Sequence, residues 1–304
     1  MLIQLDKYIY TMKMWKHVTN HFSDYQDIKQ GINLIDDADL KICWGALSEL
    51  TGKRAVMETG FFWDASHIDT VGLYQYSSLN TPTAIKAIAE YDAKVSAKEL
   101  VGRMKGRSKY PQGQDPEWKI ADVSDAEIVL ACQEPHDRSI RSVTSPENYY
   151  KFIEDACKFY GDSLFIKLHP WNSGESGERI RQIAKNYNVR AAKVNHRVLE
   201  NCKFCLVFNS TFAVDCFVRD VPVAHYAPGY FYQLPAVEYT EFTFPTDIKT
   251  DLQFAQKTCD FLIWNYCFDH SMSVDKWIEI FEIFAKSNKM FPLPERLSYA
   301  TNKL

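Results

Sequence analysis

The chain has 304 residues, and its 35 basic and 39 acidic side chains give a formal net charge of −4. Hydrophobic residues make up 46% of the chain and aromatic residues 14%, so it is not intrinsically disordered. Its 12 glycines and 12 prolines are too few for a fibrous or low-complexity protein. The net acidity excludes a surface that is basic throughout and coats a polyanion, but it leaves room for one basic patch.

The N-terminal sequence has no apolar stretch of signal-peptide length, because Asp6, Lys7, Lys13 and Lys16 interrupt it. No charge-free apolar run of roughly 18 residues occurs, so we expect no membrane span. Most of the eight cysteines lie in apolar runs, which is typical of buried free thiols in an intracellular protein. We therefore expect a cytoplasmic location.

The first half of the chain contains irregularly spaced elements. Residues 39–44 and 54–57 have the apolar content of strands, and residues 82–90 are typical of a helix. The stretch at residues 110–117 is rich in turn-forming residues and indicates a linker. We therefore place an N-terminal α/β domain at residues 1–118.

Strands and helices alternate regularly in the second half. The predicted strands lie at residues 127–132, 164–168, 189–193, 204–208 and 221–225. The predicted helices between them lie at residues 145–160, 175–187, 195–201 and 210–217. Apolar strands that alternate with helices are typical of a parallel sheet covered on both faces. Residues 251–287, rich in Trp and Phe, predict further helices.

These elements predict an α/β fold of two Rossmann-like domains that face each other across a cleft, followed by C-terminal helices. The second domain covers residues 119–265, and the helices of residues 266–304 could return to the first domain. In such sheets, ligands bind at the carboxyl ends of the strands. The residues that follow the predicted strands are therefore candidates for a functional site.

Polar side chains follow four of these strands. One cluster lies in the first half and three lie in the second: Glu58; Gln133, Asp137, Arg138 and Ser139; Lys167 and His169; and Asn209, Ser210 and Thr211. Each cluster by itself could be a helix cap or a surface charge. Because all four fall at the same topological edge, we expect them to form one site.

The chemistry of these side chains suits a nucleotide-sugar. Ser210 and Thr211 would offer hydroxyls and backbone N–H groups to a phosphate at a helix start. Lys167 and His169 alternate along one strand and would neutralise a leaving phosphate from one face. The sequence contains no P-loop, no GxGxxG and no residue set that demands a divalent metal. We therefore expect neither a metal ion nor a resident cofactor.

Asp137 and Glu58 come from opposite halves of the chain. Paired carboxylates across a cleft suit glycosyl transfer, in which one acts as the nucleophile and the other as the acid/base. On this interpretation the second domain binds the nucleotide-sugar and the first binds the acceptor.

A series of short motifs resembles the capsule-polysaccharide-biosynthesis family, which includes the bacterial β-Kdo transferases. The motifs span about residues 55–226 and read Glu58-Thr-Gly-Phe-Phe, Tyr76-Ser-Ser-Leu79, Gln133 to Ser139, Lys167-Leu-His169-Pro170, Asn209-Ser-Thr211 and Val221-Pro-Val223. The resemblance implies a glycosyltransferase of the GT-B type that needs no metal ion. It also implies a retaining mechanism with a covalent glycosyl adduct.

Carried over by motif position, the resemblance implies that Asp137 forms the adduct and that Glu58 is the acid/base. It implies that His169, Ser210 and Thr211 hold the donor's phosphate. We assign the other donor contacts to the rest of the same clusters, which are Gln133, Arg138, Ser139, Lys167 and Asn209. The chain departs from the family after the first motif, where Phe62 and Trp63 replace a frequent Arg, and again at residues 212–215. Because of these departures, the resemblance does not fix the sugar as Kdo and does not identify the acceptor.

The segment at residues 94–109 carries six basic residues and one acidic residue, a charge of +5. It is either a solvated helix face or a mobile loop, or else a contact for a polyanion, such as a phosphorylated glycolipid, an acidic glycan or DNA. Aromatic residues around Trp63, His67 and Tyr74 could stack on a base or a sugar, or could belong to the core. The predicted acceptor contacts are Lys98, Arg103, Lys105, Arg107, Trp63, Tyr76, Ser77 and Ser78.

Three functions remain open at this point. The first is a glycosyltransferase that uses a CMP- or UDP-type donor and a bacterial surface glycan or glycolipid. The second applies the same chemistry to hydroxymethylcytosine in DNA, as T-even phages do. The third is a non-catalytic, sugar-binding partner of another transferase.

Overall fold

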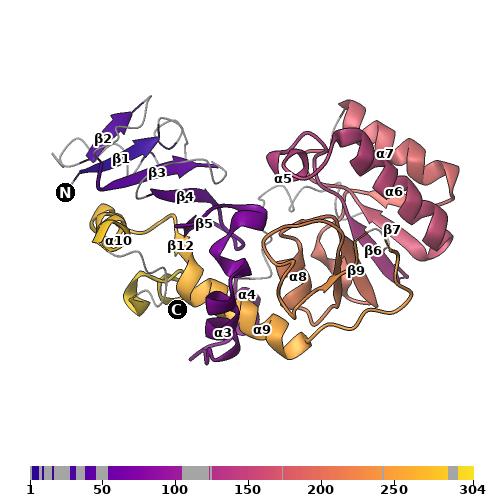
Figure 1. Ribbon diagram of the computed structural model, residues 1–304. Helices are drawn as coiled ribbons and strands as arrows, with labels where there is room; N and C mark the ends of the chain where they lie inside the picture. The colour runs from indigo at the N-terminus through magenta and orange to yellow at the C-terminus, as the bar shows by residue number, and fades with distance from the viewer. Residues whose placement is uncertain are drawn as a thin grey trace.

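The computed structural model describes residues 2–6, 9, 16, 28–31, 38–45, 54–104, 123, 125–172, 174–241, 243–286 and 294–304. These residues form two lobes, each built around a six-stranded sheet (Figure 1). We call the lobe that holds both chain ends the N-lobe and the other the C-lobe. The predicted α/β fold with two Rossmann-like units is confirmed. The boundary predicted after residue 118 lies outside the described residues, and that at residue 265 stays a prediction.

The N-lobe sheet has the strand order β12-β5-β4-β3-β1-β2. Its strands are β1 (Ile3–Asp6), β2 (Ile28–Gly31), β3 (Leu40–Trp44), β4 (Arg54–Thr59), β5 (Ala65–Asp69) and β12 (Cys267–Asp269). Strands β2, β1, β3 and β4 run parallel, and β5 and β12 add an antiparallel edge. The β4–β5 hairpin pairs Glu58 with His67, so these side chains lie on the same face.

The C-lobe sheet is parallel throughout, in the order β11-β10-β9-β6-β7-β8. Its strands are β6 (Ile128–Ala131), β7 (Leu164–Lys167), β8 (Arg190–Ala192), β9 (Phe204–Val207), β10 (Val223–His225) and β11 (Glu238–Tyr239). Every residue of β6, β7 and β9 is buried. Such continuous apolar runs are expected in a parallel sheet with helices on both faces, as predicted.

Eight α-helices, in the described part of the chain, surround the sheets. They are α3 (Pro82–Ala89), α4 (Ala97–Arg103), α5 (Arg138–Arg141), α6 (Pro146–Tyr160), α7 (Gly174–Asn186), α8 (Ala213–Phe217), α9 (Leu252–Phe261) and α10 (Val274–Lys286). The α6 start follows from its sequence: the Ser145 hydroxyl accepts from the Asn148 N–H, and Pro146 needs no N–H partner.

The two faces of the C-lobe sheet belong to different apolar clusters. Leu130 and Ile166 pack with residues of α6 and α7, whereas Val129 and Phe165 pack with residues of α8 and α9. The second cluster is continuous with the N-lobe core around β3, β4 and β5. Burial of apolar surface therefore joins the lobes, and α9 packs against α3 and α4 of the N-lobe as well as α8.

The prediction of helices throughout residues 251–287 is wrong for the middle of that segment. Helix α9 ends at Phe261, a π-helical turn follows at Leu262–Tyr266, and β12 then pairs antiparallel with β5. The segment is buried, so its backbone N–H and C=O groups need partners, and the edge of β5 supplies them. Apolar content by itself did not distinguish this edge strand from a helix.

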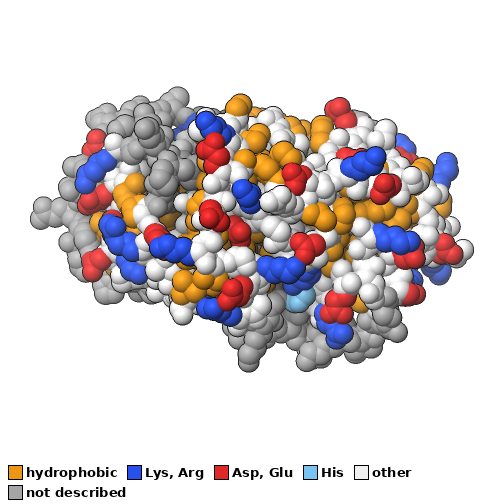
Figure 2. Space-filling model, turned by 90° about the horizontal axis from the view of Figure 1, so that it is seen from below, with side chains coloured by type: hydrophobic (Ala, Val, Ile, Leu, Met, Phe, Trp, Pro, Cys, Tyr) orange, Lys and Arg blue, Asp and Glu red, His pale blue; other side chains and the backbone are white. Residues whose placement is uncertain are grey.

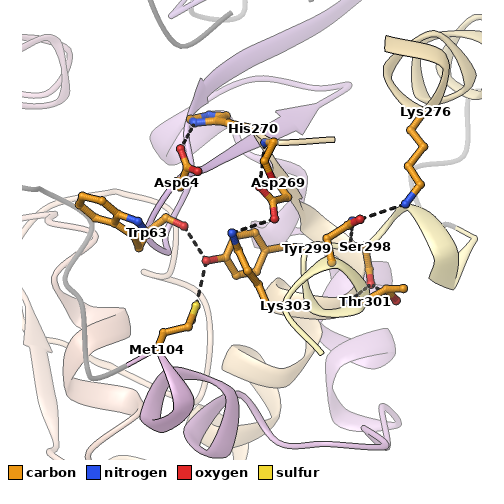
Figure 3. Close-up of polar contacts among 12 residues, drawn as sticks. Trp63, Asp64, Met104, Asp269, His270, Lys276, Ser298, Tyr299, Thr301 and Lys303 are labelled. Carbon is orange, nitrogen blue, oxygen red and sulfur yellow. Dashed lines mark hydrogen bonds and ion pairs between the residues drawn. The ribbon is translucent and has the colours of Figure 1, made fainter. Parts of the chain in front are cut away.

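The C-terminal residues anchor this strand to the N-lobe (Figure 3). Asp269 is wholly buried, and its carboxylate forms an ion pair with the Lys303 ammonium at 2.8 Å. The Tyr299 hydroxyl donates to the backbone carbonyl of Trp63 at 2.5 Å (Figure 3). The chain end thus closes over β12 and holds the β4–β5 loop.

We expect Lys303→Met to lower the free energy of unfolding by about 2 kcal/mol, because it leaves the buried Asp269 carboxylate without its cation. Chemical denaturation of both proteins measures this difference. The matched control is Lys286→Met, which breaks an exposed i,i+4 pair with Glu282 and should change stability by about 0.5 kcal/mol or less. Equal effects of the two variants would show that the Asp269 pair does not anchor the chain end.

Candidate functional site

A cavity lies where the lobes meet, and nine of the ten predicted catalytic and donor-binding residues line it. Residues from β4, β5 and the segments that follow them form its N-lobe wall: Glu58, Thr59, Phe61, His67 and Tyr74. The C-lobe wall includes nine residues at strand ends, namely Gln133, Asp137, Ser139, Lys167, His169, Trp171, Asn209, Ser210 and Thr211. The structure therefore brings all three predicted catalytic residues to one cavity.

The parallel pairing of the C-lobe sheet explains this convergence. Ala131 of β6 lies in register with Lys167 of β7 on one side and with Val207 of β9 on the other. The loops after these three strands must then leave the sheet at the same edge. Sequence positions as distant as 133 and 209 are thereby brought within hydrogen-bonding distance.

A closed network of hydrogen bonds holds Asp137. The Ser139 backbone N–H and hydroxyl both donate to Asp137 Oδ1, at 2.8 and 2.7 Å. Gln133 Nε2 donates to the Ser139 hydroxyl at 3.0 Å and to Asn209 Oδ1 at 2.8 Å, and its Oε1 accepts from the Asn209 N–H. The cavity is lined by three of the predicted donor contacts, Gln133, Ser139 and Asn209. Their polar groups are engaged in the hydrogen bonds just described, which orient Asp137.

Lys167 and His196 supply basic groups deep in the cavity. Burial lowers the pKa of Lys167, and the carboxylate of Asp215 opposes this shift. The Lys167 ammonium lies 4.9 Å from the centre of the Phe212 ring, in a cation–π contact. Burial, together with the positive charge of Arg219, lowers the pKa of His196 and favours its neutral form. The cavity floor is thus suited to an anion that contacts Lys167.

The geometry around His169 fixes which ring nitrogen carries its proton. The backbone N–H of Trp171 donates to His169 Nδ1 at 3.2 Å, so Nδ1 needs a free lone pair. The proton of the neutral ring then sits on Nε2, which can donate to a phosphate oxygen. His169 is well suited to the phosphate-binding role predicted for it.

Glu58 lies at the end of β4, where its Oε1 accepts from the Thr59 N–H at 2.7 Å. Its other oxygen lies beside Gly45, whose φ of +61° suits glycine. A Cβ on Gly45 would lie 3.5 Å from Glu58 Oε2 and 3.2 Å from Arg138 Nη1. The Arg138 side chain therefore extends from the C-lobe to the N-lobe, near Glu58. Arg138 was predicted to contact the donor, but it does not line the cavity.

The predicted helix at residues 210–217 starts later than expected. Helix α8 begins at Ala213 with Phe212 as its N-cap, and the Ser210 hydroxyl accepts from the Phe212 N–H at 3.2 Å. Ser210 and Thr211 are therefore turn residues before a short helix and not its caps. Both still line the cavity.

Ser77 and Ser78, predicted acceptor contacts, are buried and do not line the cavity. Their hydroxyls donate to Asp69 Oδ2 at 2.8 and 3.0 Å, and the Tyr266 hydroxyl donates to the same oxygen at 2.6 Å. Burial raises the pKa of Asp69, and these hydrogen bonds oppose the shift. The two serines therefore stabilise a buried carboxylate, which corrects the prediction that they contact the acceptor.

The basic segment is paired with acidic side chains where the structure describes it, and its predicted contact with the acceptor stays a prediction. Lys98 pairs with Asp220 of the C-lobe, and Arg103 pairs with Glu99. Acidic and basic side chains are interspersed over the face shown in Figure 2. Exposed pairs of this kind do not present a uniform positive field to a polyanion. Lys105 and Arg107 lie outside the described residues.

Trp63 and Tyr76, the aromatic residues predicted to contact the acceptor, do not line the cavity. Trp63 is half-buried and its carbonyl accepts from Tyr299. Tyr76 is 45% exposed on a separate surface. Neither position supports an acceptor contact at this cavity.

The lobes meet at an aromatic seam beside the cavity, formed by Phe61, His67, Tyr74, Tyr230 and Tyr266. His67 Nε2 lies 3.0 Å from the Tyr230 hydroxyl, and the His67 ring stacks on Phe61 with centroids 4.8 Å apart. Tyr230 also contacts Tyr74 edge-on at 5.3 Å. Tyr230 was not among the predicted site residues, although it follows the predicted strand at 221–225. Aromatic spacing did not indicate a contact with the other half of the chain.

Ser66, His270 and Asp64 form a second cluster, on the N-lobe. His270 Nε2 lies 2.7 Å from the Ser66 hydroxyl, and its Nδ1 lies 3.2 Å from Asp64 Oδ1 (Figure 3 shows the His270–Asp64 contact). This order resembles a hydrolytic triad, but Ser66 is wholly buried and cannot reach a substrate. The cluster instead fastens the end of β12 to the β4–β5 hairpin.

Among the residues described above, no group of three His, Cys, Asp or Glu side chains could hold a metal ion. Within that same part of the chain, no helix is both long enough and apolar enough to cross a membrane.

No protein-family model matches the sequence, and no curated protein matches it. Solved structures that are similar in fold include the β-Kdo 2,7-transferase and the β-Kdo 2,4-transferase of Thermosulfurimonas dismutans KpsC. The first is 16% identical, covers 94% of this chain and 100% of its own, and gives a TM-score of 0.59. The second is 14% identical, covers 84% of this chain and 89% of its own, and gives a TM-score of 0.54. The chain therefore shares the GT-B fold of β-Kdo transferases, as the motif series implied.

We expect Gly229→Ala to lower the free energy of unfolding by about 1–3 kcal/mol, because the new Cβ would lie 2.9 Å from Asn209 Cβ. The same glycine's carbonyl accepts from Asn80 of the N-lobe at 2.8 Å, so the substitution also disturbs the contact between the lobes. Thermal unfolding measures the loss.

The matched control is Gly102→Ala in α4, where an added Cβ meets no atom within 4 Å. It should leave stability unchanged or raise it by about 0.5 kcal/mol. A Gly229→Ala protein as stable as the wild type would contradict the proposed tight approach to Asn209.

Proposed function

We propose that the chain is a glycosyltransferase that moves a sugar from a CMP- or UDP-type nucleotide-sugar to an anionic bacterial surface glycan or glycolipid. One observation carries the proposal: Glu58 and Asp137, from opposite lobes, line one cavity beside Lys167 and His169. Two carboxylates and phosphate-binding groups in one cavity are what glycosyl transfer from a nucleotide requires. We place the reaction in the cytoplasm, with no metal ion or resident cofactor.

The donor's phosphate would contact the Lys167 ammonium, the His169 Nε2–H group and the hydroxyls of Ser210 and Thr211. These groups line one part of the C-lobe wall. Their positive charge and hydrogen bonds would stabilise the nucleotide as it leaves with the negative charge. A phosphate leaving group needs no proton, so this step requires no general acid.

In the first chemical step, the Asp137 carboxylate would attack the anomeric carbon of the donor. Both hydrogen bonds that Ser139 donates to this carboxylate use Oδ1, so Oδ2 would be the attacking oxygen. The bond from Oδ2 to the anomeric carbon forms while the carbon–oxygen bond to phosphate breaks. The bonding electron pair stays with the phosphate oxygen, and the sugar becomes an ester of Asp137.

In the second step, the acceptor hydroxyl would attack the anomeric carbon and give its proton to Glu58. The ester bond breaks, the Asp137 carboxylate is restored, and the sugar keeps the anomeric configuration that it had in the donor. Glu58 then loses the proton to solvent. Glu58 lies opposite His67 in the β4–β5 hairpin, so both side chains lie on one face of the sheet, and both line the cavity that contains Asp137.

Transfer to DNA gains no support from the described residues. That reaction needs a basic surface, and Lys98 and Arg103 are each paired with a carboxylate. We therefore propose a glycan or glycolipid acceptor. A non-catalytic sugar-binding role would conserve the fold but would not need Asp137 held by a closed network of hydrogen bonds.

We expect Asp137→Ala to reduce transfer by about 1000-fold or more, because it removes the nucleophile. Mass spectrometry of products from a panel of nucleotide-sugars with glycan, glycolipid and hydroxymethylated-DNA acceptors measures the activity. The matched control is Asp155→Ala, which removes an exposed carboxylate of α6 and should retain wild-type activity. Full transfer by Asp137→Ala would rule out the nucleophile assignment, and no transfer by the wild type across the panel would favour a non-catalytic role.

Intact-protein mass spectrometry tests the two-step mechanism. Glu58→Gln should accumulate a protein whose mass is increased by one glycosyl group, since the acceptor hydroxyl has lost its base. The double variant Glu58→Gln/Asp137→Ala should show no added mass. An inverted anomeric configuration in the wild-type product would contradict the double displacement.

A further inference from the structure

Lys167, His169 and Trp171 occupy alternate positions at the end of β7, and all three line the cavity. Their exposure increases along the chain. Lys167 is 8% exposed, His169 is half-buried and Trp171 is 53% exposed. A cation, an imidazole and an indole therefore follow one another from the floor of the cavity towards its mouth.

The turn that carries Trp171 is fixed from below by Asn172, which is wholly buried. Its Oδ1 accepts from the His169 N–H at 2.7 Å, and its Nδ2 donates to the Gln133 carbonyl and to Glu134 Oε2, each at 3.1 Å. A Cβ on Gly177 of α7 would lie 2.7 Å from the Asn172 carbonyl oxygen, so the turn packs closely on that helix. The backbone beneath the indole has little freedom to move.

Exposing the apolar ring of an indole to water costs free energy, and a ligand that covers the ring removes this cost. Trp171 is such an indole, on a fixed turn in the cavity wall. Among the described residues, six large hydrophobic side chains are exposed, and Trp171 is the one of these that lines the cavity. Its ring contacts His169 edge-on, with centroids 5.5 Å apart and planes at 74°. The indole is therefore oriented by a neighbour that we assign to phosphate binding.

We propose that Trp171 is the platform on which the nucleobase of the donor stacks. The inference rests on the proposed function, since it extends the phosphate contacts of Lys167 and His169 outwards along the same nucleotide. A nucleotide carries an anionic phosphate and a flat base, separated by a ribose. The order of cation, imidazole and indole follows that sequence of groups. Stacking on an aromatic face accepts any base, so Trp171 contributes affinity and leaves base identity to other contacts.

The test compares ligands with and without a base. Isothermal titration calorimetry measures the binding of CMP, UDP and ribose 5-phosphate to the wild type, Trp171→Ala and Trp171→Phe. We expect Trp171→Ala to weaken CMP and UDP by about 10-fold, which is within the range for loss of one base–aromatic stack. Ribose 5-phosphate should bind all three proteins equally, and Trp171→Phe should recover most of the affinity for CMP and UDP.

Phe159→Ala is the matched control, because Phe159 is an equally exposed aromatic residue of the C-lobe that does not line the cavity. It should leave all three affinities unchanged. Unchanged CMP and UDP affinity in Trp171→Ala overturns the platform while leaving the proposed function intact. Equal losses for ribose 5-phosphate and the nucleotides also overturn it, since they indicate a displaced turn. A wild type that binds neither CMP nor UDP overturns both proposals.

Discussion

The contact between His67 and Tyr230 is the interaction on which the candidate site depends. The two side chains lie 3.0 Å apart at the seam where the lobes meet, and both are buried. His67 pairs with Glu58 across the β4–β5 hairpin, and Tyr230 belongs to the C-lobe. The distance between the two proposed catalytic carboxylates is therefore set by this seam, because each carboxylate is attached to one side of it. A desolvated aromatic contact with one hydrogen bond tolerates little displacement.

The same seam extends to the network that holds Asp137. Gly229 packs on Asn209, and its carbonyl accepts from Asn80 of the N-lobe. Asn209 in turn contacts Gln133, whose amide reaches the serine that binds Asp137. Asp137, the proposed nucleophile, is thus oriented by groups that also join the lobes. An arrangement of this kind keeps the carboxylate in one position without a ligand, which would lower the cost of organising the site in the proposed reaction.

The regular part of the fold could be predicted because local pattern and tertiary structure agree there. The strand at 127–132 and the helix that starts at Pro146 have apolar spacing and capping that fit one structure only. The edge strand β12 could not be predicted, because its apolar run fits a helix equally well and its partner lies about 200 residues away. Lys98 looked like a free cation for the same reason: its partner, Asp220, is distant in sequence.

The sequence by itself determined the α/β class, the strand ends in the C-lobe and the residue types of the candidate site. These properties follow from periodicity of 2 or 3.6 residues and from the rule that ligands bind at the carboxyl ends of parallel strands. The tertiary structure decided which of these residues share a cavity and which are used for support. In the folded chain, Ser77 and Ser78 donate hydrogen bonds to the buried Asp69, and Trp171 lies at the cavity mouth. Hydrogen-bond partners and exposure depend on atoms that are distant in sequence, so only the folded chain fixes them.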